Sequence, residues 1–163
     1  MNIKHLHEAP SLTTALTGPL HTLETHLLER QNSIEAWMRQ QWHIYKPPFY
    51  GSIDIRNAGF KVAPVDTNLF PAGFNNINKE FTPLCIQAIQ SALDKSCPDA
   101  VRVLILPENH TRNKAYLESI ATLQDLLNQS GYFTKIGTLI PEINTPTRLD
   151  LESGKSIELI PLR

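Results

Sequence analysis

One stretch of this chain, Arg56–Asn76, is dense in polar side chains that could hold a small molecule. It combines cations, a carboxylate and amides with an apolar set that predicts β-structure and turns. Glycines and prolines interrupt it often enough to fix the polar side chains in place. We call it the recognition segment, because it is typical of a small-molecule recognition loop. Its candidate ligand-binding residues are Arg56, Asn57, Lys61, Asp66, Asn68, Asn75 and Asn76.

A second polar run, Glu108–Asn113, follows an almost wholly apolar stretch and leads into a helical pattern. We call it the helix-start cluster. Backbone N–H groups at the start of a helix favour anions, and a guanidinium binds carboxylate or phosphate through paired hydrogen bonds. The cluster is therefore a candidate site for a carboxylate or a phosphate. Its candidate ligand-binding residues are Glu108, Asn109, His110 and Arg112.

Each of these residues also has a purely structural interpretation. The Asp and Asn side chains of the recognition segment can form turns by hydrogen bonding to their own backbone. Asn109 or Thr111 can cap the helix, Glu108 can complement its dipole, and His110 can be an ordinary surface histidine. The two cations of the recognition segment can be the solvated ends of strands. Residue types alone leave these alternatives open.

The elements that must position the two runs alternate between strand and helix patterns, which predicts an α/β fold with a small parallel, Rossmann-like sheet and flanking helices. Ligands bind beyond the carboxyl ends of such strands, where both polar runs are expected. Val101–Leu106 is nearly all apolar, so we expect a central strand covered on both faces. The expected strands are Tyr50–Ile55, Phe60–Val65, Val101–Leu106 and Tyr132–Leu139. The expected helices begin at Thr82 or Pro83 and after Asn113, and Gly131 caps the second.

Two further segments flank this pattern. Residues 11–43 carry the apolar stripe of amphipathic helix, with a break near residues 31–33, so we expect two helices or one with a kink. Arg148–Leu151 and Ser156–Ile160 alternate and enclose a turn, which predicts a C-terminal hairpin with one buried face. The domains expected are an N-terminal helical segment at residues 1–48 and an α/β domain at residues 49–163.

Charge and composition exclude several classes of function. The net charge of −1 gives no electrostatic footprint for nucleic acid or for an anionic membrane surface. No apolar run reaches the roughly 20 residues of a membrane span, and the N-terminus has no signal-peptide core, so we expect a cytoplasmic protein. Cys85 and Cys97 have no metal-ligand spacing, reduced thiols are expected, and Cys85 fits a helix core better than a catalytic role. Gly-rich phosphate loops, zinc spacings and a serine nucleophile elbow are all absent, and no metal site is expected.

Across Arg56–Asn76, and again across Ile105–Asn113, the chain resembles the proteobacterial type of glutamate-cysteine ligase. The likeness runs from about Trp37 to the end of the chain. The resemblance implies ATP-dependent formation of γ-glutamylcysteine, the first step of glutathione synthesis. It also implies a γ-glutamyl phosphate intermediate that the cysteine amine attacks.

Members of that family are much longer than this chain, and the resemblance places ATP, Mg²⁺ and the chemistry in a distal ATP-grasp module. We therefore expect this chain to be the substrate-side part, to bind neither ATP nor Mg²⁺ by itself, and to be inactive alone. The substrates implied are glutamate and cysteine. By charge complementarity, Arg56, Lys61 and Arg112 could bind the carboxylates of glutamate, and Asp66, Asn68 or Glu108 its ammonium group. Catalytic residues are not assigned.

Two other functions fit the same sequence. One is a stand-alone α/β domain that binds an amino acid or a small anion without catalysis. The other is a structural role, in which the apolar N-terminal helices and the terminal hairpin form an oligomer interface. Trp37, Met38 and Trp42 suit either such an interface or the domain core. The sequence leaves the oligomeric state open.

Overall fold

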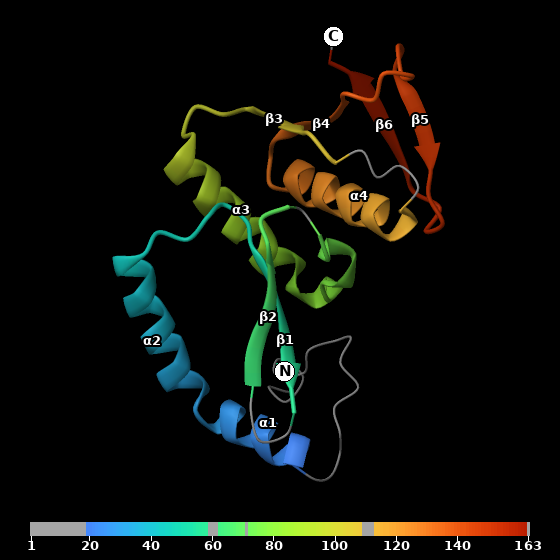
Figure 1. Cartoon of the computed structure of the whole chain (residues 1–163). Coiled ribbons are helices and arrows are strands. Elements are labelled where there is room, and N and C mark those ends of the chain that lie inside the picture. Colours follow the sequence, from blue (N-terminus) through green and yellow to red (C-terminus); the bar gives the residue numbers. More distant parts are fainter. Residues whose placement is uncertain (1–18, 59–61, 71, 109–112, 163) are drawn as a thin grey trace. The chain divides into compact units, whose positions relative to one another are not determined.

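The computed structural model describes residues 19–58, 62–70, 72–108 and 113–162. The chain divides into two compact units, Met1–Phe70 and Pro71–Arg163. Figure 1 labels the elements of both. Each unit is described by itself, and the domain boundary expected at residue 48 stays a prediction.

The described part of the first unit begins with two helices, α1 (Pro19–Glu29) and α2 (Gln31–Ile44). The helical conformation is interrupted at Arg30, between α1 and α2. This confirms two helices rather than one helix with a kink. Pro19 occupies the first helical position, where its missing N–H breaks no helical hydrogen bond. No residue of α2 is buried, and Trp37, Met38 and Trp42 are all exposed. The three side chains therefore do not fill a core, contrary to one of the two expectations.

A β-hairpin follows, made of β1 (Ser52–Asn57) and β2 (Val62–Asn68). The strands pair antiparallel, with an irregularity in register between Asp54 and Ile55. They form a two-stranded sheet separate from the larger one, so the expectation that they begin the parallel sheet is wrong. The short connection between them explains the difference, because antiparallel pairing needs only a tight loop whereas a parallel crossover needs a dozen or more residues.

The second unit begins with two short 3-10 turns, η2 (Phe74–Asn76) and η3 (Lys79–Phe81), followed by α3 (Thr82–Ser96). Asn78 accepts a hydrogen bond from the backbone N–H of Glu80, at 3.1 Å, and so starts the second turn. Helix α3 begins at Thr82 and ends before Pro98, as the sequence predicts.

A four-stranded sheet forms the other layer of this unit, in the order β3-β4-β6-β5. Strands β3 and β4 are parallel, as are β4 and β6, while β5 pairs antiparallel with β6. The α/β fold with a mostly parallel sheet and a C-terminal hairpin is therefore confirmed. The strands are β3 (Arg102–Ile105), β4 (Phe133–Thr138), β5 (Thr147–Asp150) and β6 (Ser156–Pro161).

Strand β3 lies at the edge of this sheet, so its expected central position is wrong. Its side chains alternate in exposure: Ile105 is buried, whereas Leu104 is exposed. An apolar, β-branched run is compatible with a strand at the edge or in the centre, because the pattern reports burial of side chains and not the number of hydrogen-bonded neighbours.

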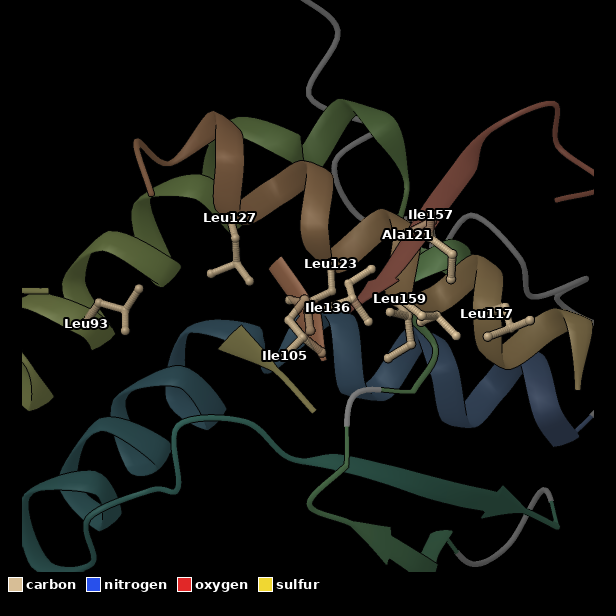
Figure 2. Close-up of a cluster of buried hydrophobic side chains, with 10 residues drawn as sticks. Leu93, Ile105, Leu117, Ala121, Leu123, Leu127, Ile136, Ile157 and Leu159 are labelled. Atoms are coloured by element: carbon tan, nitrogen blue, oxygen red, sulfur yellow. The ribbon is translucent and has the colours of Figure 1, made fainter. Parts of the chain in front are cut away.

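The core of the second unit lies between the sheet and helix α4 (Lys114–Gln129). The helix presents apolar residues at three- and four-residue spacings, and the strands present every second residue to it. Figure 2 shows these side chains pointing toward one another from α3, α4 and the strands. The buried apolar cluster comprises Leu93, Ile105, Leu117, Ile120, Ala121, Leu123, Leu127, Ile136, Ile157 and Leu159.

Helix α4 ends at Gln129, and Gly131, which the sequence predicts as its cap, directly follows the C-cap residue Ser130. Gly131 adopts φ 98°, a left-handed conformation that costs a residue with a Cβ but not glycine. The N–H of Gly131 donates to the carbonyl of Asn128 at 3.1 Å, and that of Tyr132 donates to the carbonyl of Leu127, also at 3.1 Å. This pair of bonds is a Schellman motif, and it turns the chain directly into β4.

Two matched Leu→Ala substitutions, one buried and one exposed, should lower the free energy of unfolding by different amounts. Leu127 in α4 is 2% exposed, whereas Leu84 in α3 is 63% exposed. We expect Leu127→Ala to lower the free energy of unfolding by about 2–5 kcal/mol, since it removes buried methyl groups and leaves a cavity. The control Leu84→Ala should stay within about 0.5 kcal/mol of the parent chain. Denaturant unfolding followed by circular dichroism measures both, and equal losses would contradict the described core.

Candidate functional site

Hydrogen bonds at the two ends of the helix-start cluster, Glu108 and Asn113, join the carboxyl end of β3 to the start of α4. The backbone N–H of Glu108 donates to the hydroxyl of Tyr116 at 2.9 Å. Tyr116 lies in the first turn of α4, and its own N–H donates to the side-chain oxygen of Asn113 at 3.1 Å. Asn113 is thus the N-cap of the helix, a role that the sequence analysis gave to Asn109 or Thr111.

Tyr116 is a functional candidate that the sequence analysis missed. Partial burial raises the pKa of its hydroxyl above the usual value, and the hydrogen bond from Glu108 only partly opposes this. The hydroxyl is therefore protonated at neutral pH while it accepts the N–H of Glu108. Only its apolar spacing was visible in the sequence, and that pattern assigns it to the helix face.

Of the helix-start cluster, the structure describes Glu108 and Asn113. The predicted ligand-binding residues Asn109, His110 and Arg112 lie outside the described residues. The carboxylate of Glu108 is exposed at the edge of the sheet where ligands of parallel α/β folds bind. Its role in binding stays a prediction.

A cavity of about 300 Å³ lies against the outer side of α4, and we call it the hollow. Asn75 lines it, and it is the one predicted site residue in the described part of the chain that does so. The neighbouring Asn76 is exposed, and its backbone N–H bonds to the carbonyl of Gly73 at 3.0 Å. The lining residues are Phe74, Asn75, Ile77, Lys79, Thr82, Thr122, Asp125, Leu126, Gln129 and Lys155.

Helix α4 holds the wall of the hollow in place from within the core. The backbone N–H of Phe74 donates to the hydroxyl of Ser119 at 3.2 Å, and Ser119 is buried. This bond seats turn η2 against the helix and so places Asn75. A serine within an apolar helix face gave no signal in the sequence that it would anchor a segment 45 residues away.

The charges of the hollow come from both sides. Lys155, in the turn of the terminal hairpin, forms an ion pair with Asp125 of α4, while Lys79 begins turn η3. Two ammonium groups and one carboxylate, with the amides of Asn75 and Gln129, could bind a small zwitterion or a carboxylate. The sequence gives no local signal for Lys79, Lys155 and Asp125, because they come from three segments far apart in the chain.

The turn between β5 and β6 is fastened along α4 by further polar contacts. Lys114 pairs with Glu152 at 2.6 Å, and the backbone N–H of Ser153 donates to the carboxylate of Glu118 at 2.9 Å. The hydrogen bonds from Ser153 lower the pKa of Glu118, and the bond to Glu152 raises the pKa of Lys114. Together with the Lys155–Asp125 pair, these contacts fix the hairpin that completes the hollow.

The remaining predicted residues lie in the hairpin of the first unit. Arg56 and Asn57 end β1, and Asp66 and Asn68 belong to β2; all four are exposed. The carboxylate of Asp66 accepts the N–H of Thr67 at 2.8 Å. Because Asp66 lies within β2, its interpretation as a turn former is wrong. Lys61 lies outside the described residues. A common site for these side chains and Glu108 stays a prediction.

Other chemistry finds less support among the described residues. There, no group of three or more His, Cys, Asp and Glu side chains is placed to hold a metal ion. Both cysteines are free, and burial raises the pKa of the Cys85 thiol, which makes it a poor nucleophile. In the same part of the chain, no helix has the length and apolar character needed to cross a membrane.

Comparison with known proteins identifies the family. The model of the GshA family, described as glutamate-cysteine ligase, matches residues 24–163. The chain therefore belongs to the glutamate-cysteine ligase family, of the proteobacterial type.

A solved structure supports the assignment. A protein from Methylobacillus flagellatus KT, designated a gamma-glutamylcysteine synthetase, is 58% identical and superposes with a TM-score of 0.78. The match covers 94% of this chain and 36% of that protein, so this chain spans about a third of its length. No curated protein matches the chain significantly.

The contact between Glu118 and Ser153 predicts a pH dependence. A carboxyl whose folded pKa is lowered contributes stability above its unfolded pKa, near 4.5, and loses that contribution as pH falls through the folded pKa. We expect Glu118→Gln to lower the free energy of unfolding at pH 7, with the difference from the parent chain shrinking below about pH 4.

Denaturant unfolding at a series of pH values measures this difference. Glu142→Gln, at an exposed carboxyl of the loop after β4, is the control. A deficit of Glu118→Gln that stayed constant from pH 7 to pH 3 would show that the charge of Glu118 contributes nothing.

Proposed function

We propose that this chain is the substrate-side part of an ATP-dependent glutamate-cysteine ligase, which joins glutamate to cysteine in glutathione biosynthesis in the cytoplasm. One observation carries the proposal: the family match extends over residues 24–163, and so includes both polar runs. The 58% identity to a designated gamma-glutamylcysteine synthetase supports it.

The edge of the sheet beyond β3 is the proposed place for glutamate. Helix α4 begins there, and the positive end of a helix favours a carboxylate. Arg112, between Glu108 and the cap Asn113, adds a cation that can bind a carboxylate through two hydrogen bonds. Glu108 is the proposed partner of the ammonium group. The further residues proposed to contact substrate are Arg56, Asn57, Lys61, Asp66, Asn68, Asn75, Asn76, Asn109 and His110.

The described residues do not fit ATP and Mg²⁺. They contain no cluster of side chains that could hold a metal ion, and the sequence has no Gly-rich phosphate loop. We therefore place nucleotide, metal and catalysis in the part of the ligase that the longer relative has beyond this region, and we expect this chain alone to be inactive.

A second candidate function is non-catalytic binding of an amino acid, and the hollow is the observation that favours it. Lys79 presents a cation beside the Lys155–Asp125 ion pair, around a cavity of about 300 Å³. The net positive charge of these groups favours the carboxylate of an amino acid.

The proposed glutamate site is tested by Arg112→Ala in the longer ligase, by which we mean a polypeptide that contains this chain together with the rest of the enzyme. Loss of a hydrogen bond to a charged group costs about 1.5–3 kcal/mol, so we expect KM for glutamate to rise about ten- to hundredfold. Steady-state assays of ADP release and of γ-glutamylcysteine formation, at varied glutamate, measure the effect. Arg39→Ala, at an exposed position of α2, is the matched control and should leave KM unchanged.

Two results would count against the proposal in different ways. An unchanged KM for glutamate in Arg112→Ala would remove glutamate from this edge of the sheet. No γ-glutamylcysteine from the unmodified longer protein, with ATP, Mg²⁺ and both amino acids present, would overturn the ligase function.

The second candidate makes the opposite prediction. If the hollow holds the amino acid, Lys79→Ala weakens glutamate binding measured by calorimetry, whereas Arg112→Ala does not. We expect the reverse, because the substrate edge lies beyond β3. Lys95→Ala, in the last turn of α3, is the control for removal of a surface cation.

A further inference from the structure

We propose that the face of the sheet opposite α4 is a docking surface for the rest of the ligase polypeptide. This inference rests on the proposed function, because the occupant is the part of the ligase that the longer relative has beyond this region. We call the surface the open sheet face and define it by Arg102, Leu104, Phe133 and Lys135.

The two faces of the sheet are buried very unequally. Residues Ile105 and Ile136, which face α4, are 6% and 0% exposed. Leu104, one position from Ile105, is 53% exposed, and Phe133, three positions from Ile136, is 77% exposed. Because side chains alternate along a strand, these two belong to the opposite face. A groove of about 560 Å³ runs along it, lined by the open sheet face and Val103.

The edge beside this groove is also open. Strand β3 is the first strand of the order β3-β4-β6-β5, and in the described part of the chain it pairs only with β4. An apolar edge strand is a template for pairing with further chain. The run Val101–Leu106 has the composition of a strand covered on both faces. Its sequence therefore fits a more buried position than the one it occupies here.

The longer relative indicates which polypeptide would occupy this face. The match covers only 36% of the Methylobacillus flagellatus protein, so more than half of that polypeptide lies outside this region. The side chain of Leu162, just after β6, already covers part of this face. A Cβ on Gly137 would lie 2.9 Å from the Cγ of Leu162 and 3.2 Å from the side chain of Leu104. The proposed occupant continues this cover from Leu162 toward Leu104 and Phe133.

The charges of the open sheet face describe the chemistry of that segment. Arg102 pairs in register with Phe133, and Leu104 with Lys135, so each apolar side chain has a cation beside it. A complementary segment is apolar with flanking Asp or Glu residues, because opposite charges across an interface favour the correct register.

Photo-cross-linking in the longer ligase tests the proposal. The amino acid p-benzoylphenylalanine, incorporated in place of Phe133, adds one reactive group without a change in aromatic character. On irradiation we expect one intramolecular product, and mass spectrometry should identify a cross-linked peptide from beyond residue 163. The same probe at Lys95 should give no such product. In the chain that carries p-benzoylphenylalanine at position 133, Lys135→Glu should lower the yield of the cross-linked product, whereas Lys95→Glu should not.

Three results would overturn the proposal: cross-links confined to residues 1–70, a cross-link between two copies of the chain, or no product at position 133. Ligase activity is measured on the same preparations. If γ-glutamylcysteine forms while the cross-link is absent, the docking surface fails and the proposed function stands. If the cross-link forms without activity, the docking surface stands and the proposed function fails.

Discussion

The packing of α4 against one face of the sheet is the constraint on which the rest of the second unit depends. Full burial of an aliphatic side chain contributes about 1.5–3 kcal/mol, and this interface buries Ile120, Leu127 and Ile136 almost completely. The same helix carries the contacts that position the candidate residues of the second unit. Tyr116 bonds to Glu108 at the proposed substrate edge, Ser119 seats turn η2, and Glu118 bonds to the turn of the terminal hairpin.

Much of this layer could be predicted from the sequence, because its signals are local and periodic. The apolar spacing from Tyr116 to Leu127 predicted α4, Gly131 predicted its end, and alternation predicted the buried face of β6. Position within the sheet could not be predicted. An apolar run such as Val101–Leu106 records that side chains are suited to burial, and it does not say which strands pair. The separate β1–β2 hairpin was missed although the short connection between its strands favours antiparallel pairing.

Some residues of the candidate site could likewise be predicted from the sequence, and others could not. Composition drew attention to the recognition segment and the helix-start cluster, and the resemblance carried by these runs agrees with the family match. The groups missed by sequence reasoning are joined only in three dimensions. Lys155 meets Asp125 across 30 residues of sequence, and no local pattern could pair them. Tyr116 was assigned to a helix face and Ser119 was given no role, because helical spacing does not distinguish a packing residue from one that also holds a loop.

The central claim is that this part of the ligase holds glutamate at the carboxyl edge of its sheet. Hydrogen exchange of the longer ligase, followed by mass spectrometry with and without glutamate, tests it most directly. Bound glutamate should slow exchange in residues 106–116, and exchange in α3 (residues 84–96) should stay unchanged. Protection confined to segments beyond residue 163, with residues 106–116 unaffected at saturating glutamate, would contradict the claim.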